Sequence, residues 1–157
     1  MKLTNKITIA LFSVLFLIIL TSCEDKKDDL PESAILSGTV TFIGDWPTEG
    51  TVYLSIQTAW PPTTAPYSAI TITAGDITDG HYEYSFTDVA FNTYPAITVS
   101  WLDPNDSNPA TNQHTIGAQG GTVQAYFMDA VTVTVDAENA TKTDLDITAD
   151  FSSLLVP

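Results

Sequence analysis

Apolar and polar side chains alternate along the chain from residue 34 onward, in short runs separated by turn-forming residues. In the first run Leu36, Val40 and Phe42 alternate with serine and threonine. Similar alternation marks the runs 36–42, 52–56, 70–72, 82–86, 97–101, 123–127, 131–135 and 145–149. A period of two, rich in Val, Ile, Thr and aromatic residues, predicts half-buried strands rather than helices.

The segments between these runs have the composition of turns and loops. Short segments with Gly, Pro, Asn or Asp lie at 46–50, 75–80 and 136–139, and longer polar connections are expected at 60–67 and 103–121. Strands with one apolar face cannot bury that face singly, so two stacked sheets are the simplest solution. The pattern predicts an all-β fold, a single antiparallel β-sandwich of seven or eight strands over residues 34–157.

The first 22 residues follow a different pattern. Two lysines precede an apolar run of 14 residues, 7–20, which only Thr8 and Ser13 interrupt. A helix of that length rises about 21 Å, less than the ~30 Å hydrocarbon core of a bilayer. A cleaved export signal at 1–22 is therefore favoured over a permanent membrane span.

Leu20-Thr21-Ser22-Cys23 directly follows the apolar run and resembles the lipobox of bacterial lipoprotein signal peptides. The resemblance implies cleavage before Cys23 and attachment of fatty acyl chains to that residue. Cys23 is the only cysteine, so lipid attachment also explains an odd cysteine in an exported chain. Cleavage by an ordinary signal peptidase after the small residues is the alternative.

Residues 23–33 contain Cys23 and then a charged, mainly acidic segment without apolar periodicity, which is typical of a disordered tether. An acidic cluster just after the lipidated cysteine resembles the signals that send some Gram-negative lipoproteins to the outer face of the outer membrane. We therefore expect a lipid-anchored protein of the cell outer membrane, exposed at the surface. A periplasm-facing location is the alternative.

The charge of the exported part limits its partners. Residues 23–157 carry 19 acidic side chains and three lysines, a formal charge of −16, and there is no arginine. Nucleic-acid backbones need basic contacts, so nucleic-acid binding is excluded, and adsorption to anionic head groups is disfavoured. A domain of about 124 residues is large enough to fold without a disulfide or a metal.

Residues 84–94, Tyr-Ser-Phe-Thr-Asp-Val-Ala-Phe-Asn-Thr-Tyr, resemble the central motif of carboxypeptidase regulatory-like domains, also called transthyretin-like or prealbumin-like. Segments 35–40 and 132–147 suit the opening and closing strands of that family. Asn92 stands where the family usually has glycine, and asparagine tolerates a left-handed turn. The resemblance implies a seven-stranded sandwich, transthyretin-like or immunoglobulin-like, that serves as an accessory module.

Trp46 and Trp60 lie in predicted loops beside prolines, where flat exposed rings can stack on the faces of sugars. The alternative is that both rings cap one end of the sandwich and bury apolar area. Trp101 is in phase with Ile97 and Val99, so we assign it to the core. Trp46 and Trp60 are therefore the candidate ligand-binding residues.

One loop has the composition of a weak metal site. Asp103, Asn105, Asp106 and Asn108 offer closely spaced oxygen atoms, which are the ligands that Ca²⁺ prefers. The same residues are ordinary turn formers, and the loop lacks the glycine and glutamate of an EF-hand. We assign no metal and no cofactor, and keep these four residues as weak calcium candidates.

Catalytic signals are weak in this chain. His81 is expected to point outward from a strand and His114 to lie in a polar loop, and neither has a cysteine partner for zinc. No nucleophile-elbow sequence and no assignable carboxylate pair indicates an enzyme. We expect a non-enzymatic module for binding, adhesion or assembly with a protein or glycan. The alternative is a surface lipoprotein that captures polysaccharide for a neighbouring importer.

Overall fold

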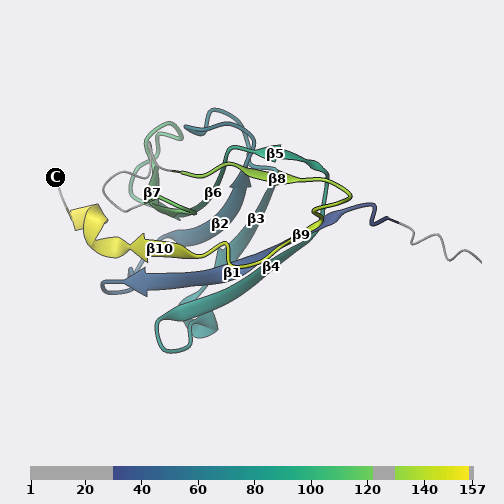
Figure 1. The fold of residues 1–157 in the computed structure, drawn as a ribbon. Coiled ribbons are helices and arrows are strands. Elements are labelled where there is room, and N and C mark those ends of the chain that lie inside the picture. Colours follow the sequence, from purple (N-terminus) through teal and green to yellow (C-terminus); the bar gives the residue numbers. More distant parts are fainter. Residues whose placement is uncertain (1–29, 122–129, 156–157) are drawn as a thin grey trace, which may run out of the picture.

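The computed structural model describes residues 30–121 and 130–155 of the chain. The predicted signal peptide, Cys23 with most of the tether, and the predicted strand at 123–127 lie outside the described residues. Within them the chain is an all-β sandwich with almost no helix, as the alternation predicts (Figure 1).

The described residues form ten strands and two short 3₁₀ helices. The strands are β1 (Ala34–Ile43), β2 (Thr51–Gln57), β3 (Ser68–Ile72), β4 (His81–Val89), β5 (Asn92–Tyr94), β6 (Ala96–Leu102), β7 (Gln113–Ala118), β8 (Val133–Val135), β9 (Thr141–Lys142) and β10 (Ile147–Asp150). The 3₁₀ helices are η2 (Ala74–Asp76) and η3 (Phe151–Leu155). Seven strands have four or more residues, and β5, β8 and β9 have two or three.

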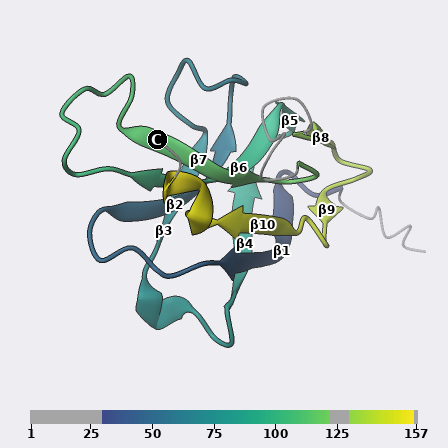
Figure 2. The same cartoon turned by 90° about the vertical axis from the view of Figure 1, so that its left-hand side faces the viewer.

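The strands form two larger sheets and one small ribbon (Figures 1 and 2). One sheet has the order β10-β1-β4, with β9 also paired to β1, and the other has the order β3-β2-β6-β7. β5 and β8 form the ribbon. All pairs are antiparallel except those of β1 with β9 and β10, which are parallel. The C-terminal segment therefore runs along β1 in the same direction as β1.

The core consists of the inward-facing apolar residues of both large sheets. Leu36 and Val40 of β1, Leu54 and Ile56 of β2, and Val99 of β6 are completely buried. All five occupy apolar positions of the predicted runs. The period of two therefore predicts which side chains form the core of these strands.

Polar residues on the other face of β2 and β6 are buried as well, which the alternation did not predict. The Gln57 amide nitrogen donates to Ser55 Oγ at 2.8 Å and to Thr98 Oγ1 at 2.9 Å. The exposed fraction of each of these three residues is 2% or less. Their mutual hydrogen bonds offset the cost of removing polar groups from water.

β7 lies within the segment that the sequence analysis assigns to a long polar loop, so that prediction is wrong for residues 113–118. Ile116 and Ala118 are buried, and so is Gly117 between them. A Cβ at Gly117 would collide with the Thr148 carbonyl oxygen of β10. This strand was missed because it has few large apolar side chains; β7 pairs with β6, and β10 lies close to Gly117.

The left-handed residue within 84–94 is Asp88, whose φ is 56°. Asn92 is not among the residues with positive φ; it begins β5, and its side-chain oxygen accepts a hydrogen bond from the Thr93 amide. The expectation that Asn92 replaces a left-handed glycine is therefore wrong. The resemblance to carboxypeptidase regulatory-like domains stays a prediction.

Candidate functional site

A half-open groove of about 690 Å³ lies at one end of the sandwich. We call it the end groove. Its walls are residues 44–49 between β1 and β2, Trp101, Asp103, Asn105, His114, and Phe151, Ser152 and Leu154 of η3. Figure 2 faces this end of the molecule, with η3 in front of the sheets.

The end groove and the entry of the chain into the sandwich lie at opposite ends of β1. The strand begins at Ala34, and its last residue, Ile43, directly precedes Gly44 in the groove wall. A ten-residue strand is about 33 Å long. In Figure 1 the chain enters at the right, whereas η3 lies at the left. The groove therefore opens at the end that is remote from Ala34.

Trp46 lines the groove and is held in place by two phenylalanines. The Trp46 ring centroid lies 5.2 Å from those of Phe42 and Phe151, edge to face in both pairs. The two phenylalanine rings stack on each other at 5.5 Å. Aromatic pairs of this kind contribute about 0.5–1.5 kcal/mol each beyond their buried area. Trp46 thus both caps the sandwich and forms a firm groove wall.

Trp101 also lines the groove, although the sequence analysis assigns it to the core. The ring packs against the core but is only partly buried, so that assignment is incomplete. Its Nε1 donates to the Glu49 carbonyl oxygen at 2.9 Å, and a Cβ at Gly50 would collide with the same Nε1. The His114 ring lies beside it with centroids 5.6 Å apart. These contacts fix the orientation of the indole before any ligand binds.

Three acidic residues, Asp45, Glu49 and Asp103, line the end groove. Asp103 Oδ1 accepts the Asn105 amide at 2.8 Å. Within 30–121 and 130–155, neither the Asp45 nor the Glu49 carboxylate has a hydrogen bond or an ion pair. Lys142 is the single lysine in those ranges, and it lies in β9, beside the first residues of β1. The groove therefore has three carboxylates and one imidazole, that of His114, and no described lysine nearby.

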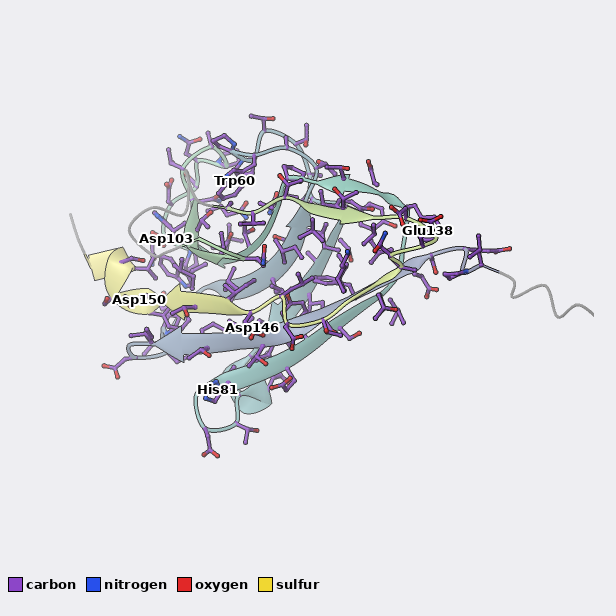
Figure 3. All side chains as sticks on the ribbon, viewed as in Figure 1. Trp60, His81, Asp103, Glu138, Asp146 and Asp150 are labelled. Carbon is purple, nitrogen blue, oxygen red and sulfur yellow. The ribbon has the colours of Figure 1, made fainter. Side chains whose placement is uncertain are left out.

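Trp60 does not line the end groove, although its neighbours line a second, smaller hollow of about 360 Å³. Pro61 and Pro62 form part of that hollow, together with Gln113, Thr115 and residues of η3. Both hollows share His114 and Leu154 as lining residues, so they lie on either side of these two side chains. Trp60 and Asp103 lie toward the same end of the sandwich, away from Glu138 (Figure 3). A ligand contact for Trp60 stays a prediction.

The 103–108 loop uses its side-chain oxygen atoms to form turns. Asp103 accepts the backbone amide of Asn105, Asp106 that of Asn108, and Asn108 that of Ala110, at 2.8 to 3.1 Å. Each is a side chain-to-backbone bond two residues ahead, the geometry of an Asx-turn. In the part of the chain that is described, no three His, Cys, Asp or Glu side chains are grouped to hold a metal ion.

Asp106 has a second role in this loop. Its Oδ2 accepts a 2.6 Å hydrogen bond from Thr111 Oγ1, which ties the two ends of the loop together. This bond and that from the Asn108 amide lower the pKa of Asp106 below its ordinary value, and His114 adds to the effect. The loop is therefore arranged around an ionised Asp106.

The two histidines lie in different sheets. His81 is exposed at the start of β4, as predicted, and its Nδ1 lies 3.1 Å from Thr41 Oγ1. His114 lies in β7 and not in a loop, so that prediction is wrong. Its exposed ring forms part of the end groove beside Trp101. The end groove therefore offers a ligand aromatic ring faces, hydrogen-bonding groups and negative charge.

Of the groove residues, the sequence analysis named Trp46 as a candidate ligand-binding residue and Asp103 and Asn105 as weak calcium candidates. It did not single out Trp101 or His114 for binding. A signal for Trp101 was its place as the next-to-last residue of a strand, directly before the polar loop. For His114 no signal was available, because β7 itself was not predicted.

The comparisons with known proteins return no relative for this chain: no family model matches it, and neither a curated protein nor a solved structure does. In the described ranges, no helix has the length and the apolar composition needed to cross a membrane.

Proposed function

We propose that this chain is a lipid-anchored lipoprotein of the cell outer membrane, exposed at the surface, with a non-enzymatic β-sandwich that binds a partner. The anchor is inferred from Cys23 directly behind an apolar export signal and before an acidic tether. The binding function is supported by the position of the end groove, which lies about one full strand length from Ala34. A tether attached at Ala34 leaves that groove free to meet partners.

Fractionation of cells that express the wild-type chain and the Cys23→Ser variant tests this proposal. The wild type is expected in the outer-membrane fraction and to be digested by protease added to intact cells. The Cys23→Ser variant is expected to leave the membrane, since only a lipidated cysteine gives stable attachment. A wild-type chain that is as soluble as the variant would contradict the proposal.

A second candidate function is capture of polysaccharide for a neighbouring importer. The observation that favours it is that two tryptophans, Trp46 and Trp101, line one groove together with polar side chains such as Asn105 and His114. Flat rings bind the apolar faces of sugars, and side-chain amides, imidazoles and carboxylates bind the hydroxyl groups.

A glycan array probed with the full-length chain in detergent tests this candidate. Trp46→Leu and Trp101→Leu, which retain apolar bulk, are expected to weaken any glycan signal. Trp60→Leu tests the predicted ligand contact of Trp60 separately, because Trp60 does not line the end groove. An array without signal, or a signal that all three variants retain, would rule out capture at this site.

A further inference from the structure

The end groove has a charge that restricts what it binds. We infer that it binds a saccharide chain that carries protonated amino groups, and not an acidic or a neutral polysaccharide. This inference rests on the second candidate function, glycan capture, and adds the chemical class of the glycan.

The groove has more acidic than basic side chains. Asp45, Glu49 and Asp103 line it, against one imidazole, that of His114. In the described ranges, Asp45 and Glu49 have no partner for their carboxylates. Lys142, the one described lysine, lies beside Leu36, seven residues along β1 from Ile43, which corresponds to about 23 Å of strand. That distance exceeds the ~8 Å over which exposed charges interact at physiological salt. An ammonium group is the complement, whereas a uronic acid or a sulfate group is repelled.

Two tryptophans form an aromatic wall of the groove. Trp46 is fixed by Phe42 and Phe151, and Trp101 by the Glu49 carbonyl oxygen and His114. Indole faces attract cations as well as the C–H faces of sugar rings, and cation–π pairs contribute about 0.5–1 kcal/mol at exposed sites. Because both rings are fixed before binding, little side-chain entropy is lost when a ligand stacks on them.

The end groove adjoins the smaller hollow, because His114 and Leu154 line both. A chain of several sugar rings would therefore find a second hollow next to the groove. A linear saccharide chain has flat rings for the tryptophans, hydroxyl groups for Asn105 and His114, and regularly spaced amines for the carboxylates. A lysine-rich peptide offers the ammonium groups but no flat ring face.

Calorimetric titration of the full-length chain in detergent with two matched tetrasaccharides tests the inference. One is β-1,4-linked glucosamine, with free amines, and the other is its fully N-acetylated, neutral form. At mildly acidic pH the amine form is expected to bind at least about tenfold more tightly than the N-acetylated form, because several weak exposed ion pairs add together. Added salt is expected to reduce this difference in affinity. Equal binding of the two forms, or binding of neither, would overturn the inference.

Two triple variants that change the net charge equally test whether the preference for the amine form arises in the groove. Asp45→Asn, Glu49→Gln and Asp103→Asn together are expected to abolish the preference for the amine form. Asp88→Asn, Asp144→Asn and Glu138→Gln, away from the groove, are expected to retain it; asparagine tolerates the positive φ of Asp88 and Asp144. A preference retained by the first triple would overturn the inference. Binding of spermidine or of a tetralysine peptide as tight as that of the amine tetrasaccharide would also overturn the inference.

These results are separable from the membrane anchor. Loss of the amine preference with intact binding of the N-acetylated form would leave glycan capture standing and remove only the charge selectivity. Fractionation of Cys23→Ser reports on the anchor alone, since Cys23 takes no part in the groove.

Discussion

The Tyr84 hydroxyl donates a 2.5 Å hydrogen bond to the carbonyl oxygen of Leu145, and both residues are buried. The bond joins β4 to the segment between β9 and β10, and the Leu145 amide in turn donates to the Ser37 carbonyl oxygen of β1 at 3.1 Å. Burial, with a contribution from Asp146, raises the pKa of Tyr84 well above its ordinary value, so the hydroxyl stays a donor. These bonds attach the C-terminal segment to the sheet.

Tyr84→Phe is expected to lower the free energy of unfolding by about 1–2 kcal/mol, because the buried Leu145 carbonyl loses a partner. Chemical denaturation followed by circular dichroism measures the change. Tyr53→Phe is the control, since Tyr53 is half-buried in β2 and its hydroxyl has no hydrogen bond within the described part of the chain. Equal effects of the two variants would show that the Tyr84 bond does not stabilise the fold.

Gly117→Ala is expected to destabilise the sandwich by about 1–3 kcal/mol, because the added methyl group meets the Thr148 backbone and forces β7 and β10 apart. Thermal melting measures the change. At Gly75 the nearest atom to an added Cβ lies 3.7 Å away, so Gly75→Ala is expected to be nearly neutral. A Gly117→Ala protein as stable as the wild type would mean that β7 and β10 are not in close contact.

Gly50→Ala is expected to move Trp101 and to change the tryptophan fluorescence spectrum, in addition to destabilising the chain. Gly50 and Gly80 have similar φ values, 84° and 83°, so an alanine at either position costs about 1–2 kcal/mol of backbone strain. Only at Gly50 does the added Cβ collide with Trp101. Gly80→Ala is therefore expected to destabilise without a spectral change. Matching spectra for the two variants would contradict the fixed position of Trp101.

Thr111→Val is expected to raise the pKa of Asp106 toward its ordinary value, because the strongest hydrogen bond to the carboxylate is removed. The folded-state pKa of Asp106 is lowered, so its stabilising effect is present at neutral pH and is lost as the pH falls through that pKa. NMR titration of the Asp106 carboxyl carbon measures the shift. A carboxyl that titrates identically in both proteins would show that Thr111 is not its partner.

The alternation of apolar and polar residues predicted the fold class and most of the core. The buried residues of β1, β2 and β6 were predicted correctly, because one face of each strand packs against the opposite sheet. It did not predict that Ser55 and Gln57 are buried, since polar residues that satisfy one another cannot be recognised from their period. It also missed β7, a strand with few large apolar side chains that pairs with β6 and has Gly117 close to β10.

The candidate site was only partly predictable, because a groove consists of loops that are distant in the sequence. Trp46 was recognised from its loop composition. Trp101 follows the period of β6 and thus looked like a core residue, although its position near the strand end places part of the ring in the groove. η3 and the loop after β1 come together only in the folded chain, so no local sequence pattern predicts that both line the groove.

The proposed function depends first on the proposed lipid on Cys23, because that lipid would hold the sandwich at a membrane. Mass spectrometry of the intact chain purified from cells tests it most directly. The predicted mass is that of residues 23–157 with a diacylglyceryl thioether and an amide-linked acyl chain on Cys23. A mass that retains residues 1–22, or a mature chain with an unmodified Cys23 thiol, would contradict the account.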